Sequence, residues 1–423
     1  MTTKQKTHTT GEVFDDGSII ELLYDPIKGA TRFVFQSNKK RKILNEARFN
    51  GRSYKPYSAS NHLIKNKAVL FPSDIIDYGS YDLLVTEIRQ FLDRFIVLES
   101  SFAEMTVHYI LLSWVSNAFQ QVPYLRKYGD FGTGKTRFLS AIGSLCYKPI
   151  FASGASSTAA LFHTLDTFRG TLVLDEADFR YSDEKHDLAK ILNNGFTKGY
   201  PVLRCAFNKK KEFDPIAYQV YGCKLVAARK PFTDAALESR FISEEPDCFH
   251  IPDHIPAELP KEFELEAQIL RNKLLAYRLD KLSSVGDQVD STLGQKLEPR
   301  IRQLFAPLLA VTENESAKTR VLTSAEEYSV QLKSYRTQTI ESHVLEVIKE
   351  LEECAEHIAI GEIAKLTEAR FSEQHERRIT ARWVGYVLSK SLRLKTLKKG
   401  GIFYLVENQS KALKQLYLRY GIV

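Results

Sequence analysis

The sequence contains no long hydrophobic segment. Its 423 residues include no window near the roughly 18 uninterrupted apolar residues that a membrane-spanning helix needs. The first eleven residues, MTTKQKTHTTG, are polar and lack the apolar core of a secretory signal. We therefore expect a soluble, cytoplasmic protein without a membrane partner.

Cysteine is scarce and scattered. The five cysteines are odd in number and never form a Cys-x-x-Cys pair, and no histidine has a partner at metal-ligand spacing. This pattern excludes a disulfide framework and a structural zinc site. The cysteines are Cys146, Cys205, Cys223, Cys248 and Cys354.

Internal repeats and low-complexity tracts are also absent. Because 43% of the residues are hydrophobic, the chain can form a large core, which excludes a disordered or fibrous protein. Charge of one sign is concentrated at one end: residues 361–423 contain 13 Lys and Arg against 5 Glu, whereas the whole chain has a net charge of +7. This asymmetry favours an acidic partner for the C-terminal part, and nucleic acid is the commonest such partner.

Hydrophobic periodicity and turn signals divide the chain into six segments. Residues 123–245 alternate short apolar strands with helical stretches, which predicts a parallel sheet covered by helices. The predicted segments are a β-rich N-terminal module (1–72), a helical region (73–122), the α/β core (123–245), a helical lid (246–312), a linker (313–340) and a compact C-terminal domain (341–423).

The core begins with a phosphate-loop pattern. Residues 129–136, Gly-Asp-Phe-Gly-Thr-Gly-Lys-Thr, follow a predicted strand (124–128) and precede a predicted helix (137–146). Glycines let backbone N–H groups approach phosphate oxygens, and the helix presents its positive end to the anion. Lys135 is expected to bridge the β- and γ-phosphates of ATP and Thr136 to hold Mg²⁺, unless the motif is a chance glycine-rich turn. The predicted nucleotide-binding residues are Gly129, Gly132, Thr133, Gly134, Lys135 and Thr136.

An acidic pair follows a buried strand forty residues later. The apolar run 171–174 ends in Asp175 and Glu176, and the carboxyl end of such a strand lies beside the phosphate loop in parallel sheets. We expect Asp175 to bind Mg²⁺ and Glu176 to polarise the attacking water. Taken alone, acidic residues after a strand are also typical of a solvated turn.

These two motifs together resemble the AAA+ ATPases. The next segment resembles, more narrowly, their MCM-like and superfamily III hexameric DNA helicases: a predicted hairpin (202–207 and 213–221) precedes the core strand 224–228. The resemblance implies a pre-sensor-1 hairpin whose tip lysines, Lys209, Lys210 and Lys211, contact single-stranded DNA in a ring channel. The alternative is a solvated basic turn. The letters of residues 175–178 also match DEAD-box helicases, but the chain lacks motifs for their second domain.

Three arginine positions extend the resemblance. The segment 235–241 resembles the Leu-x-Ser-Arg-Phe signature, which implies that Arg240 is an arginine finger reaching the nucleotide of the neighbouring subunit; a salt bridge with Glu238 or Glu244 is the alternative. The segment 297–310 resembles a sensor-2 helix, so Arg300, or else Arg302, is expected to contact nucleotide. The sequence departs from the family where a polar sensor-1 residue is expected, because residues 227–229 read Ala-Ala-Arg.

The C-terminal domain resembles a winged helix. Helices are predicted at 342–354, 360–369 and 380–394, and the third has an apolar face of Val384, Val387, Leu388 and Leu392. A hairpin with a Gly-Gly turn follows as the wing. The resemblance implies binding to duplex DNA, with protein contacts as the alternative. The predicted DNA-binding residues are Arg382, Lys390, Arg393, Lys398 and Lys399, with Tyr386 on the same face.

Together these features predict an α/β protein with an AAA+ P-loop core, a β-rich N-terminal module and a C-terminal winged helix. We expect an ATP- and Mg²⁺-dependent DNA helicase or translocase that forms a hexamer and acts in the DNA replication of a phage or mobile element. A replication initiator or helicase loader that uses ATP as an assembly switch is the alternative. A third is a DNA-binding regulator with a decayed ATPase.

Overall fold

The computed structural model describes residues 6–175, 183–207, 213–232, 234–244, 252–286, 297–337, 339–354, 357–375 and 378–422. The chain forms two compact units, Met1–Ala325 and Glu326–Val423. The predicted segment boundaries at residues 72, 122, 245 and 312 all fall within the first unit.

A five-stranded parallel sheet lies at the centre of the first unit. Its strand order is β14-β8-β13-β10-β9, and each neighbouring pair is parallel. The strands are β8 (Tyr124–Tyr128), β9 (Ile150–Ser153), β10 (Leu172–Asp175), β13 (Lys224–Ala228) and β14 (Phe241–Glu244). Apolar runs such as Leu172–Leu174 are buried, as strands covered on both faces require. The predicted mixed α/β fold with a parallel sheet is therefore confirmed.

Helices surround this sheet, as the amphipathic patterns predict. Helix α4 packs against β10 and β13, and its Gly143 permits the close approach, since a Cβ there would lie 3.1 Å from the Val173 side chain. Helix α3 packs on α8 and α9. The helices are α2 (Tyr81–Phe95), α3 (Ser100–Val115), α4 (Lys135–Gly143), α5 (Thr158–Phe168), α6 (Asp183–Asn194), α7 (Ala235–Glu238), α8 (Lys261–Val285) and α9 (Pro299–Ala310).

The N-terminal strands are fixed to the core by a buried ionic cluster. Glu21 on β3 pairs with Lys148 at 2.9 Å and with Arg278 on α8 at 2.7 Å. Burial raises the pKa of Glu21, but the two cations together lower it by more, so its pKa lies below the ordinary value. These strands form the sheets β1-β7-β6 and β2-β3-β4-β5. They are β1 (Lys6–Thr9), β2 (Gly11–Val13), β3 (Ile19–Asp25), β4 (Ala30–Ser37), β5 (Lys40–Leu44), β6 (Ala47–Phe49) and β7 (Arg52–Pro56), followed by helix α1 (His62–Lys65).

The predicted linker is helical. Residues 315–337 form α10 (Glu315–Thr337), in which Ala317, Val321 and Ala325 are buried at four-residue spacing. Arg320 on the same helix pairs with Glu104 of α3 at 3.0 Å. The sequence predicts only a linker here, because the segment is polar and weakly patterned. The short apolar stripe of Ala and Val is enough to pack the first half of the helix on the first unit.

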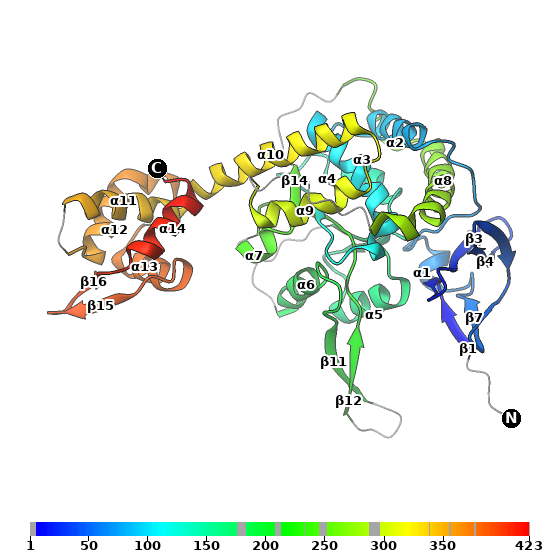
Figure 1. Ribbon diagram of the computed structural model, residues 1–423, viewed down its shortest axis with the longest axis horizontal. Helices are drawn as coiled ribbons and strands as arrows, with labels where there is room; N and C mark the ends of the chain where they lie inside the picture. Colours follow the sequence, from blue (N-terminus) through cyan, green and yellow to red (C-terminus); the bar gives the residue numbers. More distant parts are fainter. Residues whose placement is uncertain are drawn as a thin grey trace. The chain divides into compact units, whose positions relative to one another are not determined.

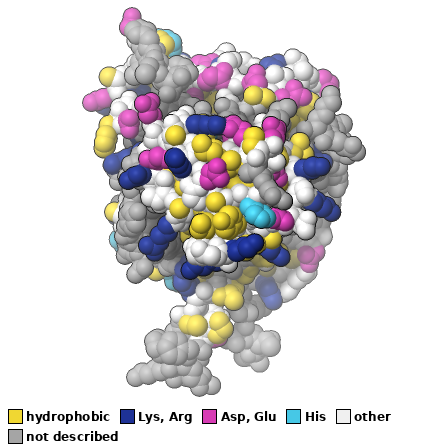
Figure 2. Space-filling view, turned by 90° about the vertical axis from the view of Figure 1, so that its left-hand side faces the viewer, with side chains coloured by type: hydrophobic (Ala, Val, Ile, Leu, Met, Phe, Trp, Pro, Cys, Tyr) yellow, Lys and Arg dark blue, Asp and Glu magenta, His cyan; other side chains and the backbone are white. Residues whose placement is uncertain are grey.

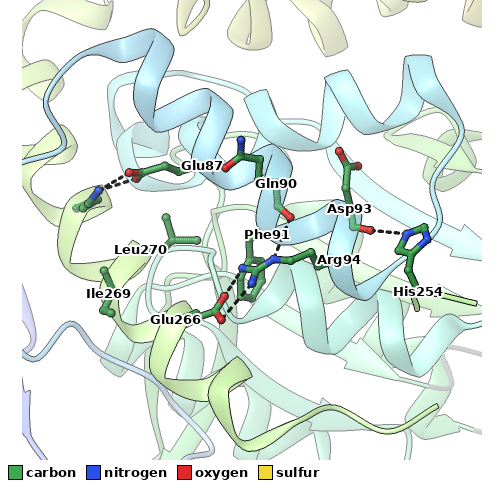
Figure 3. Close-up of a pocket in the computed structure, with 10 residues that line it drawn as sticks. Glu87, Gln90, Phe91, Asp93, Arg94, His254, Glu266, Ile269 and Leu270 are labelled. Atoms are coloured by element: carbon green, nitrogen blue, oxygen red, sulfur yellow. Dashed lines mark hydrogen bonds and ion pairs between the residues drawn. The ribbon is translucent and has the colours of Figure 1, made fainter. Parts of the chain in front are cut away.

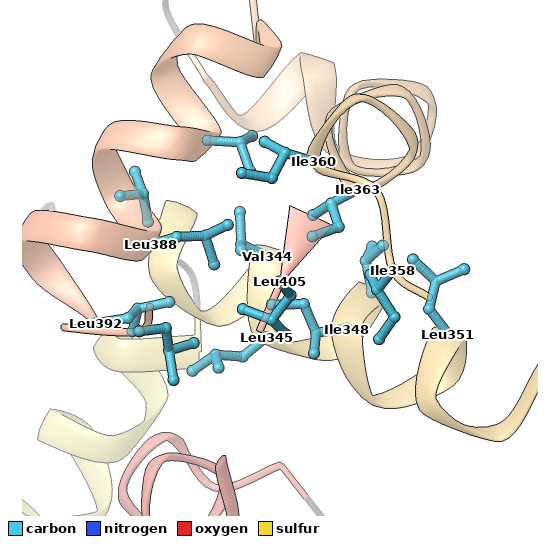
Figure 4. Packing of buried hydrophobic residues seen from close by; sticks show 14 of the residues in the cluster. Val344, Leu345, Ile348, Leu351, Ile358, Ile360, Ile363, Leu388, Leu392 and Leu405 are labelled. Atoms are coloured by element: carbon cyan, nitrogen blue, oxygen red, sulfur yellow. The ribbon is translucent and has the colours of Figure 1, made fainter. Parts of the chain in front are cut away.

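The second unit contains the three helices and the hairpin that the sequence predicts, together with a further C-terminal helix that it does not predict. They are α11 (Ile340–Cys354), α12 (Ile360–Phe371), α13 (Ala381–Tyr386) with a π-helical continuation (Val387–Ser391), β15 (Thr396–Lys399), β16 (Ile402–Leu405) and α14 (Ser410–Tyr420). Val344, Ile348, Ile363, Leu388 and Leu405 pack into one core, seen in Figure 4. The predicted apolar face of the third helix is buried there.

Two expected absences can be compared with the part of the chain that the structure describes. None of its helices combines the length and apolar character needed to cross a bilayer. Its four cysteines, Cys146, Cys205, Cys223 and Cys354, are unpaired, and within the same residues no group of three or more His, Cys, Asp and Glu is placed to hold a metal ion. Cys248 lies outside the described residues.

Candidate nucleotide site and arginine cluster

The phosphate-loop motif forms a turn between β8 and α4. Gly132 and Gly134 have φ of +81° and +75°, a region that side chains with a Cβ rarely adopt. Gly134 is the residue that precedes α4, so the loop ends at the positive end of a helix. The motif therefore has the strand, loop and helix that its interpretation as a phosphate-binding loop requires.

Lys135 lies across the loop that precedes it. Its Nζ donates to the carbonyl oxygens of Gly129 at 2.7 Å and Asp130 at 2.5 Å, and lies 3.5 Å from Thr133 Oγ1. Thr133 Oγ1 in turn donates to Asp130 O at 2.9 Å. The ammonium group is thus held over the loop, which is the position from which it can contact phosphate oxygens.

Thr136 and Asp175 meet at the carboxyl edge of the sheet. Thr136 Oγ1 donates to Asp175 Oδ2 at 3.3 Å; Thr136 lies in the first turn of α4, and Asp175 is the last residue of β10. A hydroxyl and a carboxylate oxygen form the kind of donor set that Mg²⁺ prefers, so these residues fit the predicted metal. Glu176, the predicted catalytic base, lies outside the described residues.

A cavity of about 350 Å³ opens beside these groups. It is lined by loop residues together with Asp175 and the end of β13. The resemblance predicts a polar sensor-1 residue at the end of β13. The residues there, Ala227, Ala228 and Arg229, line this cavity. The Arg229 guanidinium lies 4.6 Å from the ring centre of Phe131, a loop residue. Arg229, the residue that follows β13, contributes a polar group to this cavity.

Arg240 lies at the opposite edge of the same sheet. Its carbonyl oxygen accepts a hydrogen bond of 2.9 Å from the backbone N–H of Tyr124, the first residue of β8. The phosphate loop follows the last residue of β8, about 13 Å away at the usual rise of a strand. Arg240 does not line the cavity at the loop. The structure therefore separates Arg240 from the phosphate loop of its own chain.

Arg300 lies beside Arg240. Both guanidinium groups lie over the ring of Phe196, at 4.9 Å for Arg300 and 5.6 Å for Arg240. Arg300 Nε donates to Ser239 Oγ at 3.1 Å. Burial, and then the charge of Arg240, lower the pKa of Arg300. The structure thus brings Arg300 to Arg240 and not to the phosphate loop of its own chain, because α9 packs at the amino edge.

The alternative partners of Arg240 are engaged elsewhere. Glu238 pairs with Arg126, and Glu244 pairs with Lys127. Arg126 and Lys127 are successive buried residues of β8 that our sequence analysis missed. The sequence did offer a signal for them, because two adjacent charged residues in the middle of a predicted buried strand need buried partners. Phe196 was missed as well, because one phenylalanine after a helix carries no motif.

The predicted hairpin is present between α6 and β13. Strands β11 (Val202–Phe207) and β12 (Phe213–Tyr218) pair antiparallel and extend away from the helices of the first unit (Figure 1). Leu203 and Ile216 are exposed on it. Lys209, Lys210 and Lys211 lie outside the described residues.

The predicted DNA-binding residues of the second unit are exposed. The turn of its hairpin uses Gly400 and Gly401, both with positive φ, as a two-residue turn requires. Figure 2 shows hydrophobic side chains gathered among Lys and Arg side chains on one face of the molecule. Exposed apolar residues of this unit include Tyr386, Leu397, Ile402 and Phe403. The exposed basic residues are Arg382, Lys390, Arg393, Lys398 and Lys399.

A larger cavity of about 730 Å³ lies between α2 and α8 (Figure 3). Its charged groups neutralise one another: Glu87 pairs with Lys273 at 2.6 Å, and Arg94 pairs with Glu266. His254 Nε2 lies 3.3 Å from the carbonyl oxygen of Asp93. This arrangement braces the two helices and assembles no catalytic group, so the candidate site remains the smaller cavity at the loop.

No family model matches the chain, and no curated protein matches its sequence. Among solved structures, the chain is similar to the C-terminal region of NrS-1, with 11% identity, a TM-score of 0.35 and coverage of 92% of this chain and 96% of that one. It is also similar to the Aeropyrum pernix ORC1 protein in complex with DNA (16% identity, TM-score 0.24, 76% and 93% covered). A third similar structure is the JCV helicase (14% identity, TM-score 0.26, 62% and 64% covered). These values do not place the chain in a family.

Proposed function

We propose that the chain is an AAA+ ATPase that couples ATP hydrolysis to movement on DNA, as a helicase or translocase built from several copies of the chain. Lys135 and Thr136 bind the phosphates and Mg²⁺ in one copy, together with Asp175. Glu176 polarises the attacking water. Arg240, with Arg300 beside it, contacts the nucleotide of the next copy.

The observation that carries this proposal is the meeting of Thr136 and Asp175 at the carboxyl edge of the sheet, 3.3 Å apart and next to Lys135. A phosphate loop alone could be a chance turn, whereas a loop, a hydroxyl and a strand-end carboxylate at one cavity match the needs of Mg²⁺–ATP. Bound Mg²⁺–ATP supplies the reactive phosphoanhydride. The residues of the chain hold and orient it.

The arginine cluster supports a site shared between copies. Arg240 and Arg300 are two neighbouring cations at the amino edge, and a phosphate oxygen of an adjacent copy is the natural anion for them. A closed ring follows when each copy gives its arginines to the next one in the same direction. A hexamer is the ring size that the resemblance implies.

Two basic regions support DNA as the partner. The hairpin β11–β12 extends from the first unit, and the sequence between its two strands contains Lys209, Lys210 and Lys211. The second unit presents an exposed basic helix, α13 with its continuation, and a hairpin whose tip carries Lys398 and Lys399. We infer that the first contacts a single strand in the ring channel. The second unit is a winged helix that contacts duplex phosphates.

The end of β13 favours a second candidate, an initiator or loader that uses ATP as an assembly switch. Ala227 and Ala228 line the cavity where a polar sensor would orient water. Slow hydrolysis suits a switch better than a motor.

Hydrolysis of ATP and unwinding of a forked duplex by the purified protein separate the two candidates. For a helicase we expect Lys135→Ala to abolish both activities, and Lys210→Ala to lose unwinding while keeping hydrolysis. Hydrolysis without unwinding of any fork supports the initiator or loader. Absence of hydrolysis contradicts the proposed ATPase.

A further inference from the structure

Arg126 is a charged residue in the middle of the strand that leads into the phosphate loop. It lies on β8 three residues before Gly129, and its side chain is completely buried. A buried guanidinium loses its hydration and contributes little to stability, since a packed apolar side chain often serves as well at such a position. Its contacts therefore need an explanation beyond the packing of the sheet.

Among the residues that the structure describes, the hydrogen bonds of the Arg126 side chain run to Glu238 and Ser243, on either side of Arg240. Its Nη1 donates to Glu238 Oε2 at 2.7 Å, and its Nη2 donates to the other oxygen of that carboxylate. Its Nε and Nη2 donate to Ser243 Oγ at 3.1 and 2.8 Å. The guanidinium also lies 5.1 Å from the ring centre of Phe232 and 4.9 Å from that of Phe241. This is the paired geometry that arginine forms with a carboxylate and lysine cannot.

Glu238 completes the link to Arg240. Its Oε2 also accepts the backbone N–H of Phe232 at 2.8 Å, so one carboxylate joins both ends of the turn that contains α7. Arg240 follows two residues later. Its backbone N–H donates to Leu237 O at 3.0 Å, and its guanidinium donates to Ala236 O. The turn that presents Arg240 is therefore attached to the phosphate-loop strand through Arg126.

We propose that Arg126 is a positioning residue for Arg240: through Glu238 it fixes the arginine turn on the phosphate-loop strand of the same copy. This inference rests on the proposed function, in which Arg240 acts on the nucleotide of the next copy. Nucleotide binding at one loop is then mechanically linked to the arginine that serves the neighbouring site. The link is a contiguous set of contacts from Gly129 through β8 to the turn.

The opposite face of β8 offers a matched control. Lys127 forms an ion pair with Glu244 that is at least as buried, with side-chain exposures of 4% and 3%, and it also joins β8 to β14. Glu244 lies at the far end of β14 from Arg240, and its Oε1 accepts the backbone N–H of Glu99. Removal of this pair disturbs the same two strands without touching the arginine turn.

The test removes each pair as a unit in the full-length protein, so that no buried charge is left alone. The variants are Arg126→Met with Glu238→Gln, whose amide oxygen can still accept from Phe232, and Lys127→Met with Glu244→Gln as the control. Steady-state hydrolysis gives kcat and KM, a fluorescent ATP analogue gives the affinity of the loop, and circular dichroism gives the melting temperature. Arg126→Lys, which keeps the charge without the paired geometry, is a milder variant.

We expect the Arg126–Glu238 double variant to lose about tenfold or more in kcat while the analogue binds within about threefold of the unsubstituted protein. The triple variant that adds Arg240→Ala should be no slower than Arg240→Ala alone, because once Arg240 is removed Arg126 has no arginine to position. The kcat of Arg126→Lys should lie between that of the double variant and that of the unsubstituted protein. The Lys127–Glu244 control should keep its kcat within about threefold of the unsubstituted protein, even if its melting temperature falls as much as that of the Arg126–Glu238 variant.

An unchanged kcat, an equal loss in the control, or full additivity with Arg240→Ala would overturn the positioning role. Hydrolysis that needs Lys135 but not Arg240 would overturn it too, because there would be no arginine finger to position. Absence of any Lys135-dependent hydrolysis is a different result, since it contradicts the proposed ATPase itself and the positioning role with it.

Discussion

The carboxyl edge of the parallel sheet holds the phosphate loop, Thr136 and Asp175, whereas its amino edge holds Arg240 and Arg300 on the ring of Phe196. The first edge has the loop and the oxygen atoms that we propose bind phosphate and Mg²⁺. The second has two cations beside an aromatic ring. Within one chain these halves lie at opposite ends of β8, and the proposed function therefore needs a second copy to complete the site.

The largest effect is expected from a substitution at the carboxyl edge. Lys135→Ala removes the cation that lies over the loop, so we expect hydrolysis to fall about a thousandfold or more and the affinity for a fluorescent ATP analogue to fall with it. A coupled assay for released ADP and a fluorescence titration measure the two quantities. Lys318→Ala, a half-buried lysine of α10 that pairs with Glu315, is the control. Hydrolysis that survives in Lys135→Ala would show that the loop is not the site.

The next largest effect is expected from a substitution at the amino edge. Arg240→Ala should lower kcat about a hundredfold or more while the analogue still binds, because the arginine stabilises charge that develops during phosphoryl transfer. The same two assays separate kcat from affinity. A fall in affinity with kcat unchanged would place Arg240 at its own loop and would remove the contrast between the edges.

A smaller effect sharpens the contrast. Since Arg300 lies beside Arg240, we expect Arg300→Ala to lower kcat about tenfold with little change in analogue affinity. Arg320→Ala, which removes an exposed ion pair of α10, should leave both quantities unchanged. Loss of affinity without loss of kcat in Arg300→Ala would instead assign Arg300 to the nucleotide of its own chain.

The smallest effect concerns DNA. Replacement of Lys398 and Lys399 by Ala should weaken duplex binding several-fold, nearly equally for all sequences, and should reduce the slope of log affinity against log salt by about two, one per lost phosphate contact. Hydrolysis without DNA should be unchanged. Fluorescence anisotropy at several salt concentrations measures the slope. An unchanged slope would favour a protein partner for this hairpin.

The two edges differ in how far the sequence predicts them. The phosphate loop is contiguous, and its glycines are required by backbone conformation, so eight residues identify it. Asp175 was predicted because a buried strand ends there. The position of Arg300 could not be predicted, since it depends on how α9 packs against the turn at Ser239. A role for Arg126 was not predicted, although two adjacent charges, Arg126 and Lys127, lie in one short strand.

The same distinction holds across the fold. The sequence predicts the alternation of strands and helices in the core, and three helices and the hairpin of the second unit, because their apolar periods are strong; it misses α14. It does not predict α10, whose stripe of Ala317, Val321 and Ala325 is narrow and surrounded by polar residues. Nor does it predict that Glu21 ties the N-terminal strands to Lys148 and Arg278, because burial of a charge depends on partners far along the chain.

The most direct test of a site completed between copies mixes two inactive variants. Lys135→Ala keeps an intact Arg240, and Arg240→Ala keeps an intact phosphate loop. Random mixing in equal amounts should restore hydrolysis to as much as about a quarter of the unsubstituted rate, because one interface in four combines both intact halves. If the mixture stays as inactive as its components, the arginine edge does not complete the site of a neighbour.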